Sequence, residues 1–498
     1  MTTAIVASAA VSDAAELERL GDAARGHADW IEARVDRWRG SGEELAAALA
    51  RPGLPAIVTA RPRWEGGDFP GSESDRLARL RAAARTASHV DVELKAAFVS
   101  ESFAPAKKVV STHDFAATRG DLDEIVAQLR GAAADAALVK LAATPRSLSD
   151  VVRLARLQRE QARGAPPLVA FGMGELGSPT RLLAGKLGAP IVYGSVAGFE
   201  PTAPGQRDVR ELSDLFRVRE QTAATAVAAV VGNPVAHSLG PLLHNTLYLR
   251  HVLDRVFVPL RAETLDEALA AADELGIDGL SVTRPFKQAA ARAASGAIAG
   301  HPWPLPEGAV NTLKRAKSGW LAANTDRVGL LATLERGAPE LLARGRTVLV
   351  VGAGGAARTV VAALVERGLL VTVASRTAAR AVELARTLGA AAVGLASLDA
   401  SRFDLVVNAT PVGMEPDRDS SPLAGGAGAL RAGQVMLDLV YRPRRTRLLE
   451  QAEAAGARPL DGFEFFLAQA LAQFRIFTGR DGDAELARAT VERALAPL

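Results

Sequence analysis

The chain has 498 residues, of which 48% are hydrophobic and 23% are charged, and its formal net charge at pH 7 is only +3. This length exceeds one ordinary domain and allows about two to four, while the composition is that of a soluble globular protein. The 59 Lys and Arg residues are dispersed along the chain, so the composition gives no support for a nucleic-acid-binding function.

The absence of cysteine excludes disulfide bonds and thiolate chemistry and fits a reducing cytoplasm. The N-terminus lacks the basic and long apolar regions of a signal peptide, and no uncharged stretch is long enough to span a membrane. We therefore expect a cytoplasmic enzyme that acts on small molecules, with no nucleic-acid partner, no membrane association and no metal. The sequence leaves the oligomeric state open.

Short apolar runs alternate with helical stretches through the first part of the chain. We predict eight strands, at residues 3–10, 30–35, 56–60, 90–94, 109–112, 137–141, 168–171 and 191–193. Eight such repeats are the count of a (β/α)8 barrel, and a doubly wound sheet is the alternative. A barrel gathers the C-terminal ends of its strands at one mouth, and reactive side chains stand near these ends, namely Glu32, Arg34, Arg61, Glu93, His113, Lys140 and Ser195. This distribution favours the barrel.

Two of these residues have the chemistry of a carbonyl reaction. Lys140 lies in the apolar run AALVKLA, where a charged amine is costly to desolvate, so we expect a nucleophilic amine suited to imine formation with a ketone. His113, in VVSTHDF, ends the preceding run, and an imidazole can move a proton at the carbon next to the imine. Taken alone, each residue is more often structural or merely solvated. Together with the arginines they form a more specific pattern.

Residues 3–206 resemble the type I 3-dehydroquinate dehydratases, through EARVD, TARPRWEGG, VVSTHDF, LVKLA, GELGSPTRLLAGKLGAPIVYGS and TAPGQ. The resemblance implies that Lys140 forms a Schiff base with the substrate ketone, and that His113 removes the adjacent proton and then protonates the departing hydroxyl. It also implies supporting roles. Glu65 holds His113, and Arg181 pairs with the substrate carboxylate. Glu32, Arg34 and Arg61 bind hydroxyls or order the site, and Thr202 and Gln206 lie on a loop that closes over it. Thr202 stands where serine is common, and a bulkier GELG turn precedes Arg181, but neither departure removes a reacting group.

The composition of the chain changes after the eighth predicted strand. Residues 207–220 are charged with a helical pattern and residues 221–228 are small, so we place a domain boundary near 222–226. A short strand predicted at 229–231 then leads into the loop GNPVAHSLGPLLHN, whose Ser238 hydroxyl lies near a helix start. Such a loop is an anion site in principle, and an ordinary capped helix is the alternative.

A second set of reactive residues follows. The segment GLSVTRPFK predicts a strand that ends in a proline turn and displays Lys287, while GAVNT and NTD bring Asn311 and Asp326. A lysine and an aspartate paired at a domain cleft can deliver a proton to a carbonyl oxygen while a hydride arrives at the carbon. A solvated surface ion pair is the alternative.

Residues 347–377 have the pattern of a dinucleotide-binding βαβ unit. The β-branched run 347–351 predicts a buried parallel strand, and the glycine-rich turn after it lets backbone N–H groups reach a pyrophosphate. A helix to about residue 367 and a second strand at 370–374 complete the unit. The predicted cofactor-binding residues of the turn are Gly352, Ala353, Gly354, Gly355 and Ala356.

The end of the second strand predicts which cofactor is bound. NAD sites usually place an acid there, which accepts a hydrogen bond from the adenosine ribose 2′-hydroxyl. This chain has Ser375, Arg376 and Thr377 instead, with Arg380 one helical turn later. Two guanidiniums and two hydroxyls suit a 2′-phosphate and hence NADP(H). A structural Rossmann-like unit without cofactor is the alternative.

From about residue 229 almost to the C-terminus the chain resembles shikimate dehydrogenase, through the motifs above and NATPVGM, DLVYRP, DGFEF and QALAQFRIFTG in the family's order. The resemblance implies a reversible, NADPH-dependent reduction of 3-dehydroshikimate to shikimate, with Lys287 and Asp326 as the catalytic pair. It further implies that Thr283, Asn311 and Gln469 bind substrate hydroxyls, that Ser238 and Tyr441 bind its carboxylate, and that Thr410, Val412 and Met414 lie along the nicotinamide.

The resemblance also sets the expected domains: a barrel over 1–222, a substrate-binding domain over 223–335 and 463–498, and a Rossmann NADP-binding domain over 336–462. One departure is clear. Family members commonly read HSxSP, with two hydroxyls aimed at the substrate carboxylate, whereas here Gly240 replaces the second. We expect weaker carboxylate binding, or a looser preference that admits a related acid such as quinate.

The implied product of the first half is the implied substrate of the second. We therefore interpret the chain as a bifunctional dehydratase and dehydrogenase of the shikimate pathway of aromatic amino acid biosynthesis. One alternative is a second half that works on quinate in a catabolic direction. Another is a sensor that keeps both folds to bind metabolites without turning them over, and the presence of Lys140, His113, Lys287 and Asp326 argues against it.

Overall fold

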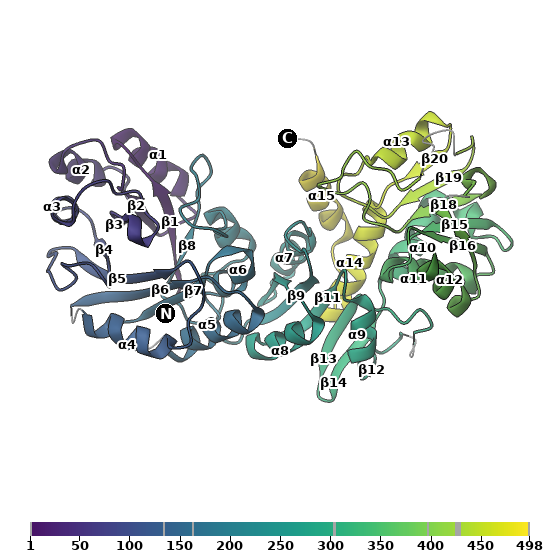
Figure 1. The fold of residues 1–498 in the computed structure, drawn as a ribbon, viewed down its shortest axis with the longest axis horizontal. Coiled ribbons are helices and arrows are strands. Elements are labelled where there is room, and N and C mark those ends of the chain that lie inside the picture. The colour runs from purple at the N-terminus through teal and green to yellow at the C-terminus, as the bar shows by residue number, and fades with distance from the viewer. Residues whose placement is uncertain are drawn as a thin grey trace. The chain divides into compact units, whose positions relative to one another are not determined.

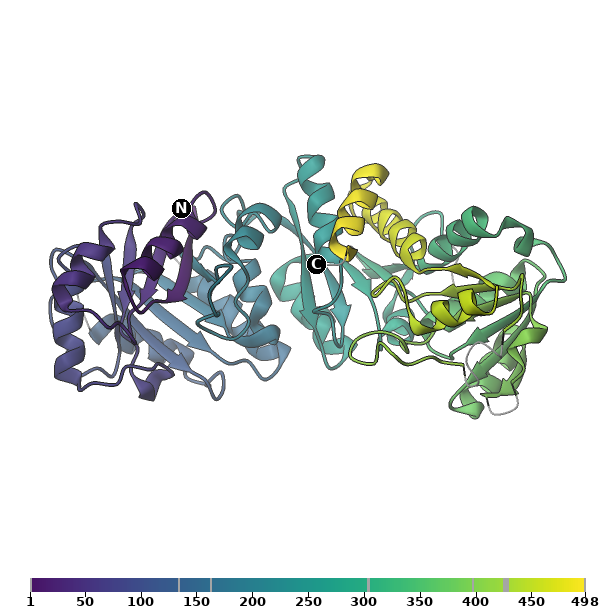
Figure 2. The same ribbon diagram turned by 90° about the horizontal axis from the view of Figure 1, so that it is seen from above.

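The structure, a computed structural model, describes residues 2–132, 135–161, 164–301, 305–395, 398–423 and 430–496. The chain divides into two compact units, the first formed by Met1–Val227 with Asp254–Gly276 and the second by Ala228–Leu253 with Ile277–Leu498. Figures 1 and 2 show the ribbon from two directions. Among the described residues, no helix is both long enough and apolar enough to cross a membrane.

The first unit is built around an eight-stranded sheet, with strands β1 Ala4–Ala10, β2 Trp30–Arg34, β3 Ala56–Thr59, β4 His89–Glu93, β5 Lys107–Asp114, β6 Ala136–Ala143, β7 Leu168–Gly172 and β8 Ile191–Gly194. Their order is β7-β6-β5-β4-β3-β2-β1-β8, and every pairing is parallel. A doubly wound sheet would reverse this order at one point, whereas sequential neighbours are those of a barrel, here nearly closed. The predicted barrel is therefore confirmed, with a strand at each predicted run.

Helices alternate with these strands: α1 Ala14–Ala24, α2 Gly42–Leu49, α3 Glu73–Ala83, α4 Leu122–Ala132, α5 Leu148–Gln161 and α6 Gly174–Leu182, with short turns η1 Arg63–Glu65 and η2 Glu211–Leu215. Local sequence fixes where some of them begin. Ser41 opens α2 and Ser72 opens α3, and each forms a capping box with the acid three residues later. The box satisfies backbone N–H groups that would otherwise lack partners.

The barrel interior has an apolar layer and a charged layer. Val6, Ile57, Val109 and Val169 belong to the apolar cluster. In β4, the acids Asp91 and Glu93 alternate with Val90 and Val92, and all four are fully buried. Because successive strand side chains point to opposite faces, both acids share one face of β4. Charge therefore lies inside the barrel near its C-terminal mouth.

After the barrel strands, the chain forms a mixed sheet and a parallel sheet. The mixed sheet has the order β10-β9-β11-β13-β14-β12, from β9 Ala226–Gly232, β10 Arg255–Arg261, β11 Ile277–Val282, β12 Gly296–Ala297, β13 Thr312–Ala316 and β14 Gly319–Ala323. Its helices are α7 Gly240–Arg250, α8 Leu265–Leu275, α9 Lys287–Ala293, α10 Asp326–Gly337, α14 Phe463–Thr478 and α15 Ala484–Leu495. Strand β10 and helix α8 of the mixed sheet fall in the segment Asp254–Gly276 that is grouped with the first unit. Helix α14 begins at residue 463, where the sequence predicted that the chain returns to the substrate-binding domain.

The parallel sheet has the order β17-β16-β15-β18-β19-β20, from β15 Thr347–Val351, β16 Leu370–Ser375, β17 Ala391–Gly394, β18 Leu405–Asn408, β19 Val435–Asp438 and β20 Arg458–Leu460. It is accompanied by α11 Gly355–Glu366, α12 Ala378–Leu388, α13 Arg447–Ala454 and the turns η3 Pro339–Leu342 and η5 Ala400–Arg402. The strand order reverses between β15 and β18, and ligands of such sheets bind at that crevice. The predicted Rossmann architecture is confirmed.

The mixed sheet and the parallel sheet are linked by α10 and α14, which pack against each other. A Cβ placed on Gly329 of α10 would lie 2.5 Å from the carbonyl oxygen of Phe465 in α14. Only glycine permits this approach of the two helices. The close crossing helps to fix Asp326, at the start of α10, relative to Gln469 of α14.

Candidate active sites

A pocket opens at the mouth of the barrel. It is lined by all nine residues that the sequence predicted for the first site: Glu32, Arg34, Arg61, Glu65, His113, Lys140, Arg181, Thr202 and Gln206. They come from β2, β5, β6, α6, the segment after β3 and the loop after β8. A parallel barrel brings such separated segments together because its strands all end at one mouth. The strand-end residues Glu93 and Ser195 do not line this pocket.

Lys140 is 3% exposed, and its amine lies among acids. Its Nζ donates to Asp91 Oδ2 at 2.7 Å, lies 3.8 Å from Glu32 Oε1 and stands 4.6 Å from the centre of the Tyr193 ring. The expectation that the apolar run would also surround the amine is therefore wrong. The apolar residues of the run are neighbours of Lys140 along the chain, whereas the Lys140 side chain lies in the charged layer of the barrel.

Asp91 is the main residue of this site that sequence reasoning missed. Burial alone would raise the pKa of Asp91, but the charges of Arg61 and Lys140 prevail and hold it well below its ordinary range. Arg61 lies 3.0 Å from Asp91, and the Ser111 hydroxyl donates to it at 2.6 Å. The signal was present in HVDVE, because acids at alternate positions of a short strand share one face.

His113 and Glu65 form a hydrogen-bonded pair, with 2.9 Å between Nδ1 and Oε2. Burial, with the charges of Arg61 and Lys140, holds the pKa of His113 well below its ordinary value. Burial raises the pKa of Glu65 to about 7, against the lowering effect of Arg61. The imidazole is therefore neutral near pH 7. Since Nδ1 faces Glu65, Nε2 is the nitrogen that can exchange a proton with a bound molecule.

Arg181 is a buried cation without an acidic partner among the described residues. It is 1% exposed, its Nη2 has no hydrogen-bond partner, and its guanidinium stands 4.1 Å from the centre of the Phe171 ring. Burial lowers the pKa of Arg181 to about 10. A buried cation facing a pocket without a counter-ion is costly. This arrangement fits a ligand that carries an anionic group.

The loop after β8 is tied to the acidic cluster. Gln206 accepts a hydrogen bond from the Thr202 backbone N–H at 2.9 Å, and the Thr202 hydroxyl lies 2.7 Å from the Ser8 hydroxyl. Ser8 in turn donates to Glu32. The threonine hydroxyl thus takes part in the site, although serine is commoner at this position.

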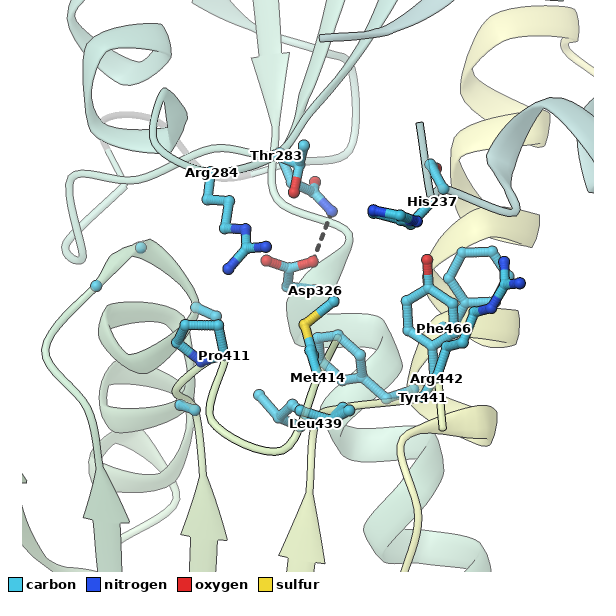
Figure 3. A pocket seen from close by; sticks show the side chains of 18 of the residues that line it. His237, Thr283, Arg284, Asp326, Pro411, Met414, Leu439, Tyr441, Arg442 and Phe466 are labelled. Carbon is cyan, nitrogen blue, oxygen red and sulfur yellow. Dashed lines mark hydrogen bonds between the residues drawn. The ribbon is translucent and has the colours of Figure 1, made fainter. Parts of the chain in front are cut away.

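The second pocket lies within the second unit (Figure 3). Fourteen of the predicted residues line it: Ser238, Thr283, Lys287, Asn311, Asp326, Ala353, Gly354, Gly355, Ala356, Arg380, Thr410, Met414, Tyr441 and Gln469. Five predicted residues, Gly352, Ser375, Arg376, Thr377 and Val412, are not among those that line it. Gly352 and Val412 are chain neighbours of the lining residues Ala353 and Pro411, and residues 375–377 lie at the end of β16, within one to two turns of Arg380.

The predicted proton-transfer pair is formed. Lys287 Nζ donates to Asp326 Oδ2, and the amide of Asn311 donates to Asp326 Oδ1 at 2.8 Å. The same amide lies 3.3 Å from the Gln469 oxygen. Asp326 is 3% exposed, so this is not the solvated surface pair that the sequence left open. Figure 3 shows Thr283 and Asp326 facing the same open space.

Ser238 and Tyr441 meet on the other side of this space. Burial raises the pKa of Tyr441, against hydrogen bonds with the Leu239 backbone and the Ser238 side chain. The Tyr441 ring stacks on Phe466 with 4.3 Å between centroids. The tyrosine is therefore a rigid, neutral hydroxyl beside a serine hydroxyl, which suits a carboxylate ligand.

The glycine-rich turn has the geometry of a pyrophosphate site. Gly352 has φ 126°, and a Cβ there would lie 2.9 Å from the Ala409 carbonyl oxygen, so a side chain is excluded. A Cβ on Gly355 would lie 2.7 Å from the Lys287 Cβ. Because Gly355 has no side chain, the backbone N–H groups at the start of α11 stay open to an anion, and Lys287 can lie close to this turn.

The ribose end has cations and no acid. Among the described residues, the side chains of Arg376 and Arg380 have no hydrogen bond or ion pair, and both residues are exposed. Their surroundings differ from an NAD site, which would place a carboxylate at the end of β16. The residues present therefore fit a dinucleotide with a 2′-phosphate.

Some motif residues turn out to be structural. Asn408 donates to Asp438 at 2.9 Å, and the Thr446 hydroxyl donates to the other oxygen of Asp438 at 2.7 Å. Thr410 donates to Asn408 at 2.6 Å. Burial raises the pKa of Asp438 to about 6. This buried network holds the segments that carry Thr410 and Tyr441.

Sequence reasoning also missed pocket residues that lie within the motifs it used. Arg284, Arg442 and His237 line the second pocket, and Figure 3 shows Arg284 and His237 on opposite sides of its open centre, with Arg442 beside Tyr441 and Phe466. Among the described residues, the guanidiniums of Arg284 and Arg442 form no hydrogen bond or ion pair, so both are available to an anionic ligand. Gly240 is buried at the start of α7, and its N–H donates to the Ser238 hydroxyl at 3.2 Å.

Comparisons with known proteins give a result for each half. The family model for type I 3-dehydroquinase matches residues 5–223. Models for the shikimate dehydrogenase substrate binding domain, for shikimate/quinate 5-dehydrogenase and for the shikimate 5′-dehydrogenase C-terminal domain match residues 230–313, 338–414 and 462–492.

Individual relatives agree. The chain is 34% identical over 486 residues to the chloroplastic bifunctional 3-dehydroquinate dehydratase/shikimate dehydrogenase of Arabidopsis thaliana, covering 92% of this chain and 79% of that protein. It is 42% identical over 281 residues to the NADP(+) shikimate dehydrogenase of Anaeromyxobacter dehalogenans, covering 55% of this chain and 98% of that protein. A crystal structure of a shikimate dehydrogenase in complex with NADP+ matches with a TM-score of 0.51 and 29% identity, covering 56% of this chain and 98% of that one.

Proposed function

The chain belongs to the family of bifunctional 3-dehydroquinate dehydratase/shikimate dehydrogenases, and from that premise we propose how its two sites divide the work. The chain is a lyase and an NADP-dependent oxidoreductase of the shikimate pathway. It dehydrates 3-dehydroquinate to 3-dehydroshikimate and reduces that product to shikimate. The roles of individual residues, given below, are proposals that rest on the geometry of the sites.

In the barrel, Lys140 attacks the substrate ketone, and water is lost as the carbon–nitrogen double bond forms. His113 removes a proton from the adjacent carbon through Nε2, then returns it to the departing hydroxyl, which leaves as water. Hydrolysis of the imine releases 3-dehydroshikimate and the free lysine. The observation that carries this assignment is a neutral imidazole and a buried amine in one pocket.

The surrounding charges support these steps. The protonated imine carries the same charge as the lysine ammonium, so Asp91 at 2.7 Å can balance both. Arg181 pairs with the substrate carboxylate, which supplies the counter-ion that this buried guanidinium lacks. Glu65 orients His113, and Glu32, Arg34, Arg61, Thr202 and Gln206 bind substrate hydroxyls or order the site.

In the second unit, bound NADPH supplies the hydride. Lys287 and Asp326 deliver a proton to the carbonyl oxygen of 3-dehydroshikimate, and Asn311 fixes the carboxylate of Asp326 by its 2.8 Å hydrogen bond. Thr283, Asn311 and Gln469 bind substrate hydroxyls, while Ser238 and Tyr441 bind the substrate carboxylate. Thr410, Val412 and Met414 lie along the nicotinamide.

The nucleotide would be held at its pyrophosphate by the glycine-rich turn, residues Gly352, Ala353, Gly354, Gly355 and Ala356. Its 2′-phosphate would be held by Ser375, Arg376, Thr377 and Arg380. We also propose the domain division predicted from the sequence, namely 1–222, 223–335 with 463–498, and 336–462. The cytoplasmic location stays a prediction.

A two-step assay tests the proposal. Purified protein given 3-dehydroquinate alone should form 3-dehydroshikimate, whose conjugated ketone absorbs in the ultraviolet, and NADPH should then convert it to shikimate. Lys140→Ala should abolish only the first step and Lys287→Ala should impair only the second. Loss of both reactions in either variant would contradict the division into two sites.

A further inference from the structure

The first unit contains a completely buried arginine outside its pocket. Arg76, on the outer helix α3, is 0% exposed, and its guanidinium stands 4.6 Å from the centre of the Phe98 ring. One edge of the guanidinium donates to Glu73, at 2.9 Å from Nε and 2.6 Å from Nη2. The opposite side donates to Glu93 and, at 3.3 Å, to the Ala60 carbonyl oxygen. Neither Arg76 nor Glu93 lines the pocket.

Arg76 is the first member of a line of alternating charges that ends at the reacting lysine. Glu93 accepts from Arg76 with one oxygen and from Arg61 with the other, at 2.7 Å. Arg61 uses its second terminal nitrogen to reach Asp91 at 3.0 Å. Asp91 uses its second oxygen to hold Lys140 at 2.7 Å. Each group therefore divides its two ends between two partners.

This division makes each contact depend on the one before it. Burial raises the pKa of Glu93, and the charges of Arg61 and Arg76 oppose that rise. Without Arg76, Glu93 would either take up a proton or turn both oxygens toward Arg61. Either change would alter the contact between Arg61 and Asp91, because charged groups buried away from solvent cannot replace a lost partner with water.

We propose that Arg76 is a positioning residue of the dehydratase reaction, which acts through Glu93 and Arg61 to fix the carboxylate that holds Lys140. The inference rests on the proposed role of Lys140. It assigns a role in the reaction to a side chain on the outer layer of the barrel, separated from Lys140 by three other residues. The alternative is that Arg76 only stabilises the packing of α3.

Three substitutions in the full chain separate these roles. Arg76→Met should lower kcat of dehydration about 10- to 100-fold and leave KM within about twofold, because a displaced amine slows imine formation while Arg181 still binds the carboxylate. Arg76→Lys, which keeps a cation beside Glu93, should recover much of that loss. Glu73→Gln, which alters only the more exposed contact, should stay close to the parent. The shikimate dehydrogenase activity of each preparation measures the amount of folded protein.

A double-mutant cycle tests the route. Glu93→Gln should lower kcat by a similar factor, and adding Arg76→Met to it should have little further effect, because the carboxylate through which Arg76 acts is gone. Multiplied effects in the double variant, or full kcat in Glu93→Gln, would overturn the proposal, and the second outcome does so even if no Arg76 variant folds. If the parent chain itself does not dehydrate 3-dehydroquinate, the proposed function fails instead.

Discussion

Lys140 and Asp91 form an ion pair of 2.7 Å inside the barrel, with both side chains almost fully buried. The contact fixes where Nζ stands, because Asp91 holds it with one carboxylate oxygen while Arg61 and Ser111 hold the other. An amine attacks a ketone only from a defined position next to the carbonyl carbon, so this contact bears directly on the proposed imine formation.

The first prediction concerns the covalent intermediate. Borohydride added together with 3-dehydroquinate should inactivate the dehydratase and leave a reduced adduct on Lys140, because reduction of an imine to an amine is irreversible. Mass spectrometry of the digested protein locates the adduct. Protein treated with borohydride alone is the control. An adduct on another lysine, or none, would remove Lys140 from the mechanism.

The second prediction separates imine formation from elimination. His113→Ala should still form the trapped adduct but should slow overall dehydration by a factor on the order of 10² to 10⁴, which is the usual contribution of a general base. The dehydrogenase activity of the same preparation should be unchanged. Undiminished dehydration would show that another group moves the proton.

The third prediction concerns pH. Burial raises the pKa of Glu65 to about 7 from its ordinary value near 4.5. The folded state therefore holds a proton that the unfolded state releases first, and the stability contributed by the neutral acid is lost as pH rises from about 4.5 to 7. The shift corresponds to about 3 kcal/mol at most.

Glu65→Gln carries no titratable group, so urea unfolding of this variant should depend less on pH across that window than unfolding of the parent chain. Circular dichroism and tryptophan fluorescence at pH 5 and pH 8 measure the difference. Equal pH dependence in both proteins would mean that Glu65 ionises normally in the folded barrel. A substitution of the neighbouring acid, such as Glu93→Asp, cannot serve as a control, because it would disturb the contacts of Glu93 with Arg76 and Arg61.

The fourth prediction concerns the cofactor. Arg376→Ala should raise the Michaelis constant for NADP about tenfold or more and barely alter that for NAD, because a charge-assisted hydrogen bond to a phosphate contributes about 1.5 to 3 kcal/mol. Arg386→Ala, which removes a cation from α12 outside the pocket lining, is the matched control. Equal changes for both cofactors would show that Arg376 does not recognise the 2′-phosphate.

Much of this architecture could be predicted because its signals are local. Short apolar runs between helical stretches predicted every barrel strand, and the glycine-rich turn after residues 347–351 predicted the nucleotide site. The family motifs identified Lys140, His113, Lys287 and Asp326, which line the two pockets. Lys140 and His113 lie in strands of the barrel, and Lys287 and Asp326 begin helices, so local sequence places all four within regular elements.

The surroundings of the amine could not be predicted in the same way. The neighbours of Lys140 in the chain are apolar, whereas its neighbours in space are Asp91, Glu32 and Tyr193 from other strands. Barrel closure creates these contacts, and nothing in the run AALVKLA encodes them. The same holds for Arg76, whose position on an outer helix gives no sign of its contact with Glu93.

The last prediction concerns Gly240, the first residue of α7, whose N–H donates to the Ser238 hydroxyl at 3.2 Å. A serine at this position would add a second hydroxyl next to the one that we assign to the substrate carboxylate. A hydrogen bond to a charged group contributes roughly 1.5 to 3 kcal/mol, or about one to two powers of ten in affinity, although a bridging water can already supply part of it.

Gly240→Ser should therefore lower the Michaelis constant for shikimate and leave the constant for NADP nearly fixed. Gly240→Ala, which adds the Cβ without the hydroxyl, separates the new hydrogen bond from the cost of a side chain at this buried position. Quinate should be tested as a substrate of all three proteins, because a looser carboxylate site would admit it in the parent and less in the serine variant. If the serine and alanine variants bind shikimate alike and quinate is inert throughout, Gly240 takes no part in recognition and the carboxylate lies elsewhere in the pocket.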